Sequence, residues 1–388
     1  MRNLILHISA FFQKERTVGL TLLSLLCLTV ILPACSGAER GDTGDFSVDY
    51  NQYTQGNGFF SCTDTAFLFY EPQKPIQFVD LELTQQPEVM CAKPNCRHDS
   101  ADCSAYVDTT GLYAYNNQLY YVAEGADSKI GLYQMDFGGG NRKELFPINE
   151  INELQSYGFT YRIASGYFLL DLQKENAFEA IDTLYLYPLK DKETAPVTIY
   201  EEVSGEELVR FWIRDDWVLY AIAQDPAAEQ QFLYGYQIST QQTTLLCDDW
   251  RFRNELTLCG DQLYFFKETG TLCVLDLTSM EKEEFPNPLE PISESYNAIY
   301  DDAYFYLTSG DSTNSFGQAG VFIYTYQGKL VQFLPFEGNK ILAYCISGPD
   351  VTLFYDVMSG ENTPVYFLEK ADIAKGQAKF LNLGERQF

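Results

Sequence analysis

Three cysteines and one histidine lie within thirteen residues of the chain, as Cys91, Cys96, His98 and Cys103. Thiolate and imidazole groups are ligands that Zn²⁺ prefers, and four of them in one short loop can surround the ion completely. Because no position would remain for an exchangeable water, such an ion would be structural rather than catalytic. The sequence therefore predicts a structural zinc site in the loop 91–103.

The spacing C-x4-C-x-H-x4-C differs from that of an ordinary zinc knuckle, so two other states of this loop stay open. Export favours disulfides, and two of the three cysteines could pair, leaving a thiol that could reach Cys62. A reactive pair of cysteine and histidine is the third state, although the sequence offers no identifiable partner that would orient the imidazole as a base.

Familiar catalytic patterns are absent from the sequence. It contains no Gly-x-Ser-x-Gly segment, and the only histidine outside the loop 91–103 is His7. A serine hydrolase with a histidine base is therefore excluded. The 54 aspartates and glutamates offer many carboxylate pairs, but no pair stands out, so a glycosidase-like pair remains only an alternative.

The N-terminal segment has the organisation of an export signal. Basic residues precede an uncharged stretch of fourteen residues, 19–32, which is shorter than the roughly 20 residues that span a bilayer. The motif Leu32-Pro33-Ala34-Cys35 resembles the lipobox of bacterial lipoproteins, which implies a signal peptide over residues 1–34 and a lipid on Cys35. We therefore expect a protein anchored to the outer face of the bacterial cell membrane.

The polar segment 35–52 is too poor in apolar residues to fold alone and is predicted to be a flexible tether. Residues 53–388 show no break in composition and are predicted to form one repetitive domain. The net charge of −28 argues against nucleic acid and against direct binding to anionic lipid, because both need a positive field. We expect a monomer.

Seven short, almost continuous apolar segments recur along the domain, 40 to 52 residues apart. They comprise residues 67–70, 119–122, 167–170, 217–220, 263–266, 303–307 and 352–355. Each precedes a second strand of alternating character, such as residues 132–137, and then a polar turn. A period in the forties with several strands per unit is typical of propeller blades.

The predicted fold is therefore all-β: a β-propeller of seven blades, with six or eight blades as alternatives. The 28 tyrosines and 28 phenylalanines support it, because the space between neighbouring blades must be filled by large flat side chains.

Segments 111–121 and 131–141 resemble the YWTD-like and TolB-like propellers of uncharacterised Gram-positive surface lipoproteins. The cysteine segment, with Pro94 before its second cysteine and Ala105-Tyr106 after its third, is similar to one that recurs in those proteins. The resemblance covers residues 55–385. It implies a propeller and a cysteine segment that acts as a unit, but no ligand.

The sequence favours a non-catalytic cell-surface lipoprotein whose propeller binds an extracellular protein, peptide or glycan. The alternative is an extracellular hydrolase or lyase that acts on polysaccharide through a carboxylate pair in the central funnel. No cofactor other than the structural zinc is expected.

Overall fold

The computed structural model describes parts of one compact unit, Ser47–Phe388. The described residues are 60–63, 65–70, 74–81, 87–91, 93–99, 102–109, 111–125, 128–151, 157–175, 180–190, 194–203, 205–224, 231–250, 256–259, 261–266, 271–285, 296–309, 317–336, 342–356 and 365–382. The predicted signal peptide 1–34, Cys35 and the tether 35–52 lie outside them.

The described chain forms seven antiparallel sheets of four strands each. Blade 1 consists of β1 (Phe60–Cys62), β2 (Ala66–Phe69), β3 (Gln77–Asp80) and β4 (Glu88–Val89). Blade 2 consists of β5 (Tyr113–Tyr115), β6 (Gln118–Glu124), β7 (Ile130–Asp136) and β8 (Lys143–Pro147). Blade 3 consists of β9 (Tyr157–Ala164), β10 (Tyr167–Glu175), β11 (Ala180–Pro188) and β12 (Val197–Glu201). Blade 4 consists of β13 (Glu207–Arg214), β14 (Trp217–Ala223), β15 (Gln231–Gln237) and β16 (Gln242–Trp250). Blade 5 consists of β17 (Leu256–Cys259), β18 (Gln262–Phe266), β19 (Leu272–Asp276) and β20 (Lys282–Phe285). Blade 6 consists of β21 (Tyr296–Tyr300), β22 (Tyr304–Ser309), β23 (Gly320–Thr325) and β24 (Leu330–Pro335). Blade 7 consists of β25 (Leu342–Ser347), β26 (Val351–Asp356), β27 (Val365–Glu369) and β28 (Leu381–Asn382).

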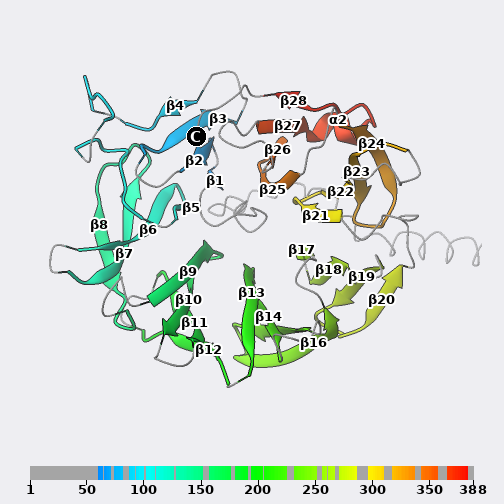
Figure 1. The fold of residues 1–388 in the computed structure, drawn as a ribbon, viewed down its shortest axis with the longest axis horizontal. Coiled ribbons are helices and arrows are strands. Elements are labelled where there is room, and N and C mark those ends of the chain that lie inside the picture. The colour runs from blue at the N-terminus through cyan, green and yellow to red at the C-terminus, as the bar shows by residue number, and fades with distance from the viewer. Residues whose placement is uncertain are drawn as a thin grey trace, which may run out of the picture. The chain divides into compact units, whose positions relative to one another are not determined.

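Every blade is built from four consecutive strands paired in chain order, and the blades stand around a common centre with their first strands innermost (Figure 1). The prediction of a seven-bladed β-propeller is confirmed. The alternatives of six and eight blades are wrong.

The apolar segments found in the sequence form the second strand of each blade, and the alternating segments form the third. In blade 2 these are β6 and β7, in which Leu119 lies opposite Met135 and the rings of Tyr121 and Tyr133 stack 5.6 Å apart. The apolar segments are thus hydrogen-bonded on both sides, but the first strands, such as β5, lie nearer the centre (Figure 1).

A separate hydrophobic core fills each of the seven spaces between neighbouring blades. Between blades 2 and 3, the ring of Phe146 stacks on Tyr187 at 5.4 Å, and both rings contact that of Phe168. Aromatic side chains of this size bury about 150 to 250 Å² each. The predicted role of the aromatic residues as packing between blades is confirmed.

The ring closes between blade 7 and blade 1 through side-chain packing. No described strand of one blade pairs with a strand of another, so this closure has no hydrogen-bonded ladder of its own. Phe67 of blade 1 is fully buried against Val351 and Leu353 of blade 7. Gly348, before β26, leaves room for that ring: a Cβ there would lie 2.5 Å from Cζ of Phe67.

Blade 7 also contains the one helix among the described residues, α2 (Lys370–Ala374), between β27 and β28. In the part of the chain that the structure describes, no helix has the length and apolar character needed to cross a membrane.

The contact between Gly348 and Phe67 predicts a coupled pair at the ring closure. Gly348→Ala should lower the free energy of unfolding by about 1 to 3 kcal/mol, because the added methyl group meets the Phe67 ring. Combining it with Phe67→Leu, which shortens that side chain, should give a double variant more stable than the sum of the single effects by at least about 1 kcal/mol.

Chemical denaturation measures this coupling. Gly140→Ala is the control, because its Cβ would meet no heavy atom within 4 Å, and it should change the unfolding free energy by less than about 0.5 kcal/mol. Strictly additive effects of Gly348→Ala and Phe67→Leu would show that this contact does not close the ring.

Candidate metal centre

The cysteine and histidine loop connects the last strand of blade 1, β4, to the first strand of blade 2, β5. The loop is tied back to blade 1 where the Ile76 amide donates to the Ala105 carbonyl at 2.9 Å, and where Tyr106 bridges to Pro75. The loop therefore lies between the outermost strand of blade 1 and the innermost strand of blade 2.

The structure brings together all four residues predicted as metal ligands. One ligand atom from each of Cys91, Cys96, His98 and Cys103 lies within 4.8 Å of the other three. Nδ1 of His98 is 3.4 Å from Sγ of Cys103. In a tetrahedral zinc site with Zn–S bonds of about 2.3 Å, neighbouring sulfurs lie about 3.8 Å apart, so the set needs only a small contraction to hold an ion.

Unusual backbone angles bring the ligands to one point. Asn95 and His98 both have φ of 59°, in the left-handed region that few residues other than glycine adopt. Asparagine tolerates this conformation, but it is uncommon for histidine. Residues held in such conformations concentrate at functional sites, because the surrounding structure must compensate their cost.

The two cysteines at the ends of the loop differ in acidity. Burial first, and then the neighbouring thiols of Cys91 and Cys96, raise the pKa of Cys103 to about 11. Burial also acts on Cys91, but hydrogen bonds, first from the Ser104 hydroxyl at 3.2 Å, outweigh it and lower the pKa to about 6. The lowered pKa makes Cys91 the readier of these two cysteines to bind a metal as a thiolate, and binding by Cys103 would release its proton.

The surroundings of the cluster suit a structural site. The Ala105 amide donates to Sγ of Cys103 at 3.4 Å, a contact of the kind that orients ligands from outside a metal's coordination shell. The loop packs on the core between blades 1 and 2, which includes Met90 and Met135.

Cys91, Cys96 and Cys103 are free thiols in the structure. Cys62, the partner considered for an odd thiol, lies instead in the core between blades 7 and 1, where its Sγ donates to the Thr63 carbonyl at 3.3 Å. Of the three states left open by the sequence, the arrangement matches the ligand set of a metal most closely.

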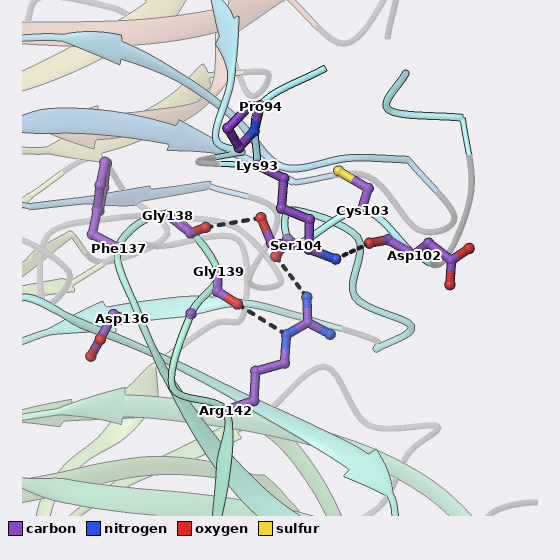
Figure 2. Close-up of a pocket in the computed structure, with 11 residues that line it drawn as sticks. Lys93, Pro94, Asp102, Cys103, Ser104, Asp136, Phe137, Gly138, Gly139 and Arg142 are labelled. Carbon is purple, nitrogen blue, oxygen red and sulfur yellow. Dashed lines mark hydrogen bonds between the residues drawn. The ribbon is translucent and has the colours of Figure 1, made fainter. Parts of the chain in front are cut away.

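A cavity of about 680 Å³ opens beside the loop (Figure 2). One wall belongs to the cysteine and histidine loop, which we call the metal-ligand loop, and the other belongs to the turn between β7 and β8. The lining residues are Lys93, Pro94, Asp102, Cys103, Ser104, Asp136, Phe137, Gly138, Gly139, Gly140 and Arg142. Sequence reasoning did not identify this cavity, and its one available signal was the run of three glycines.

The turn and the loop touch directly. Gly139 has φ of 79°, and a Cβ there would lie 1.7 Å from the Ser104 carbonyl oxygen, so no other residue fits. Arg142 fastens the contact: its Nη2 donates to the Ser104 and Tyr106 carbonyls, both at 2.7 Å, and its Nε donates to the Gly139 carbonyl at 3.3 Å. The metal-ligand loop and blade 2 therefore form one continuous wall.

Two carboxyl groups that the sequence did not single out meet within blade 3. Asp171 of β10 and Asp182 of β11 share the strand face that packs against blade 4, and Asp182 is only 5% exposed. Burial and then repulsion from Asp182 raise the pKa of Asp171 to about 7, while burial and the charge of Glu202 raise that of Asp182 to about 6. Oδ1 of Asp171 is buried with no hydrogen-bond partner among the described residues.

No model of a known protein family matches the chain, and no curated protein sequence matches it. Solved structures do resemble it. A prolyl endopeptidase has a TM-score of 0.57 at 13% identity over 86% of this chain and 51% of that one. A puromycin hydrolase has a TM-score of 0.55 at 11% identity over 88% and 56% of the two chains. An acylaminoacyl peptidase of Pyrococcus horikoshii has a TM-score of 0.51 at 9% identity over 86% and 52%.

The chain thus spans about half the length of these structures. Identities this low show a shared fold alone. The cysteine and histidine cluster must therefore be interpreted from its own geometry.

The raised pKa of Asp171 predicts a dependence of stability on pH. Because the folded protein holds this proton to about pH 7, above the ordinary value of 3.8, the unfolding free energy should fall as the pH rises between those values. Asp171→Asn removes the buried charge and should raise the melting temperature at pH 8 by about 2 to 4 °C, which corresponds to about 1 kcal/mol.

Thermal melting between pH 5 and pH 8 measures this effect, and the slope with pH should be smaller in Asp171→Asn than in the wild type. The exposed Glu283→Gln is the control and should leave both quantities unchanged. A lower melting temperature for Asp171→Asn at pH 8 would contradict the assignment.

Proposed function

We propose that the chain is a non-catalytic, extracytoplasmic binding propeller in which Cys91, Cys96, His98 and Cys103 hold a structural zinc ion. The observation that supports the metal most strongly is the convergence of four ligand atoms within 4.8 Å on a loop between two blades. A lipid on Cys35 attaches the protein to the outer face of the membrane. The propeller acts as a monomer and presents its surface to an extracellular ligand.

The donor set favours zinc over the harder cations. Three thiolates and one imidazole suit Zn²⁺, whereas Mg²⁺ and Ca²⁺ prefer oxygen ligands. Four protein ligands complete the tetrahedron, so the ion would stabilise the loop without taking part in chemistry. The loop needs such a cross-link because β4, from which it emerges, contains only two residues.

The alternative of a polysaccharide hydrolase or lyase needs a carboxylate pair in contact with substrate. Asp171 and Asp182 are the pair with the most strongly raised pKa values among the described acids that have a resolved shift. Their position argues against catalysis, because Asp182 is only 5% exposed and lies on a face packed against the next blade. The binding role therefore has the better support.

Metal content and stability test the zinc site. The full-length protein, purified in detergent, should contain one zinc ion per chain. A strong chelator should remove it and lower the melting temperature by about 5 to 10 °C, because loss of a tightly bound ion removes several kcal/mol of stability. Cys96→Ser should lose the zinc, whereas the control Asp99→Asn, beside the ligand His98, should keep it.

A thiol count on the same unfolded sample separates the two main states of the loop. The metal site requires Cys91, Cys96 and Cys103 all to react as free thiols after chelation. Two fewer reactive thiols, no metal and an unchanged melting temperature in chelator would identify a disulfide and reject the zinc proposal.

The anchor is tested separately at Cys35. Cys35→Ser should abolish labelling by a radioactive fatty acid and move most of the protein from the membrane fraction to a soluble one, because the acyl chains supply the membrane affinity. Cys27→Ser, which changes another cysteine of the same N-terminal segment, is the control and should keep the label. If the Cys35→Ser variant carries no label but stays in the membrane fraction to the same extent as the wild type, the lipid on Cys35 is not the anchor.

A further inference from the structure

Two cationic side chains line the cavity beside the metal-ligand loop. Lys93 extends from the loop and Arg142 from the end of the β7–β8 turn, and they donate to the neighbouring carbonyls of Asp102 and Ser104 (Figure 2). Lys93 donates to the Asp102 carbonyl, and Arg142 uses its Nε and Nη2 on backbone carbonyls. The remaining N–H groups of both side chains are available to a ligand.

Neither cation forms an ion pair with a carboxylate among the described residues. This is unusual in a chain with 54 acidic and only 26 basic residues. Asp102 and Asp136 also line the cavity, but their carboxylates point away from the two cations (Figure 2), and that of Asp136 accepts a hydrogen bond from Asn141. Two cations on the lining of one cavity favour an anionic ligand there.

The other wall of the cavity favours hydroxyl donors. The Gly138 carbonyl accepts a hydrogen bond from the Ser104 hydroxyl at 3.1 Å, and the Gly139 carbonyl accepts one from Arg142. Each of these two carbonyl oxygens has a second lone pair that can accept another hydrogen bond. The Gly139 amide is already used, donating to the Asp136 carbonyl at 2.9 Å. A phosphate cradle instead requires several free amides directed at the ligand, so this turn does not suit a phosphate.

An aromatic ring completes the cavity. Phe137 is 37% exposed, and edge-on packing against Phe78, with centroids 5.7 Å apart, holds its ring in place. Such a ring offers a flat apolar surface against which the C–H face of a sugar can pack. Cations, carbonyl acceptors and an aromatic face together match a ligand with a carboxylate, hydroxyl groups and a pyranose ring.

We propose that this cavity binds an acidic saccharide, with the carboxylate of a hexuronic acid between Lys93 and Arg142. The cavity volume of about 680 Å³ lies within the range of about 300 to 1,000 Å³ typical of small-ligand sites. The inference rests on the binding role proposed above and gives it a ligand class, but it does not depend on the identity of the metal.

Calorimetric titration of the full-length protein in detergent tests the ligand class with a matched pair of sugars. The trimer of β-1,4-linked glucuronic acid and cellotriose differ only in that each C6 carboxylate of the first is an alcohol in the second. The acidic trimer should bind at least tenfold more tightly, and raising the salt from 20 to 150 mM should weaken it severalfold because the charges are exposed.

Two variants test the cavity itself. Lys93→Gln should weaken the acidic trimer at least tenfold while leaving cellotriose within twofold. Gly140→Leu should abolish binding of the acidic trimer, because Gly140 lines the cavity and an added Cβ there would meet no heavy atom within 4 Å, so the larger side chain should occupy the cavity while the fold is kept. Lys143→Gln removes a neighbouring charge outside the lining and should change binding less than twofold.

Equal affinity for the two trimers, or displacement of the acidic trimer by millimolar inorganic phosphate, would overturn the ligand class. Absence of binding by protein that melts normally and carries its metal would overturn the cavity assignment and leave the zinc proposal standing. If protein that lacks metal and has paired cysteines still binds the acidic trimer selectively, the zinc proposal is overturned and the cavity assignment stands.

Discussion

Each four-stranded sheet of the propeller must have both of its faces covered, because apolar side chains project from both. In β10 the neighbouring residues Leu169 and Leu170 point to opposite faces, and both are fully buried, the first in the core shared with blade 4 and the second in the core shared with blade 2. A single sheet cannot satisfy both faces, so sheets must pack side by side until the last covers the first. Seven separate cores result, and Phe67 and Val351 complete the closing one.

The metal-ligand loop and the cavity beside it both lie at the edge of blade 1, the blade with the shortest outer strands. Among the described blades, blade 1 has the shortest second, third and fourth strands when their lengths are added. The metal-ligand loop begins after β4, which contains only two residues and therefore pairs with β3 over a very short length. There the cluster of three thiols and His98 lies, and the metal ion that we propose for it would cross-link the loop where β4 ends. The same loop leans on the β7–β8 turn through Gly139 and Arg142, and the cavity forms along that contact.

Features determined by residues close in sequence could be predicted. The second and third strands of each blade are visible because burial on both faces makes them almost continuously apolar, and the four ligands are visible because they share one loop. First and fourth strands escape detection when exposure leaves them polar, as in β20 with its Lys282 and Glu283. The cavity and the Asp171–Asp182 pair depend on the registers of separate strands and on the contact between a loop and a distant turn, which composition and spacing do not encode.

X-ray absorption at the zinc edge of the purified protein shows whether the cysteine and histidine loop holds a zinc ion, because it reports which atoms surround the ion and at what distance. Zinc bound by this loop should have three sulfurs at about 2.3 Å and one nitrogen at about 2.0 to 2.1 Å, with no coordinated water. A shell of oxygen and nitrogen ligands without sulfur would mean that any bound zinc lies elsewhere and would contradict the zinc proposal.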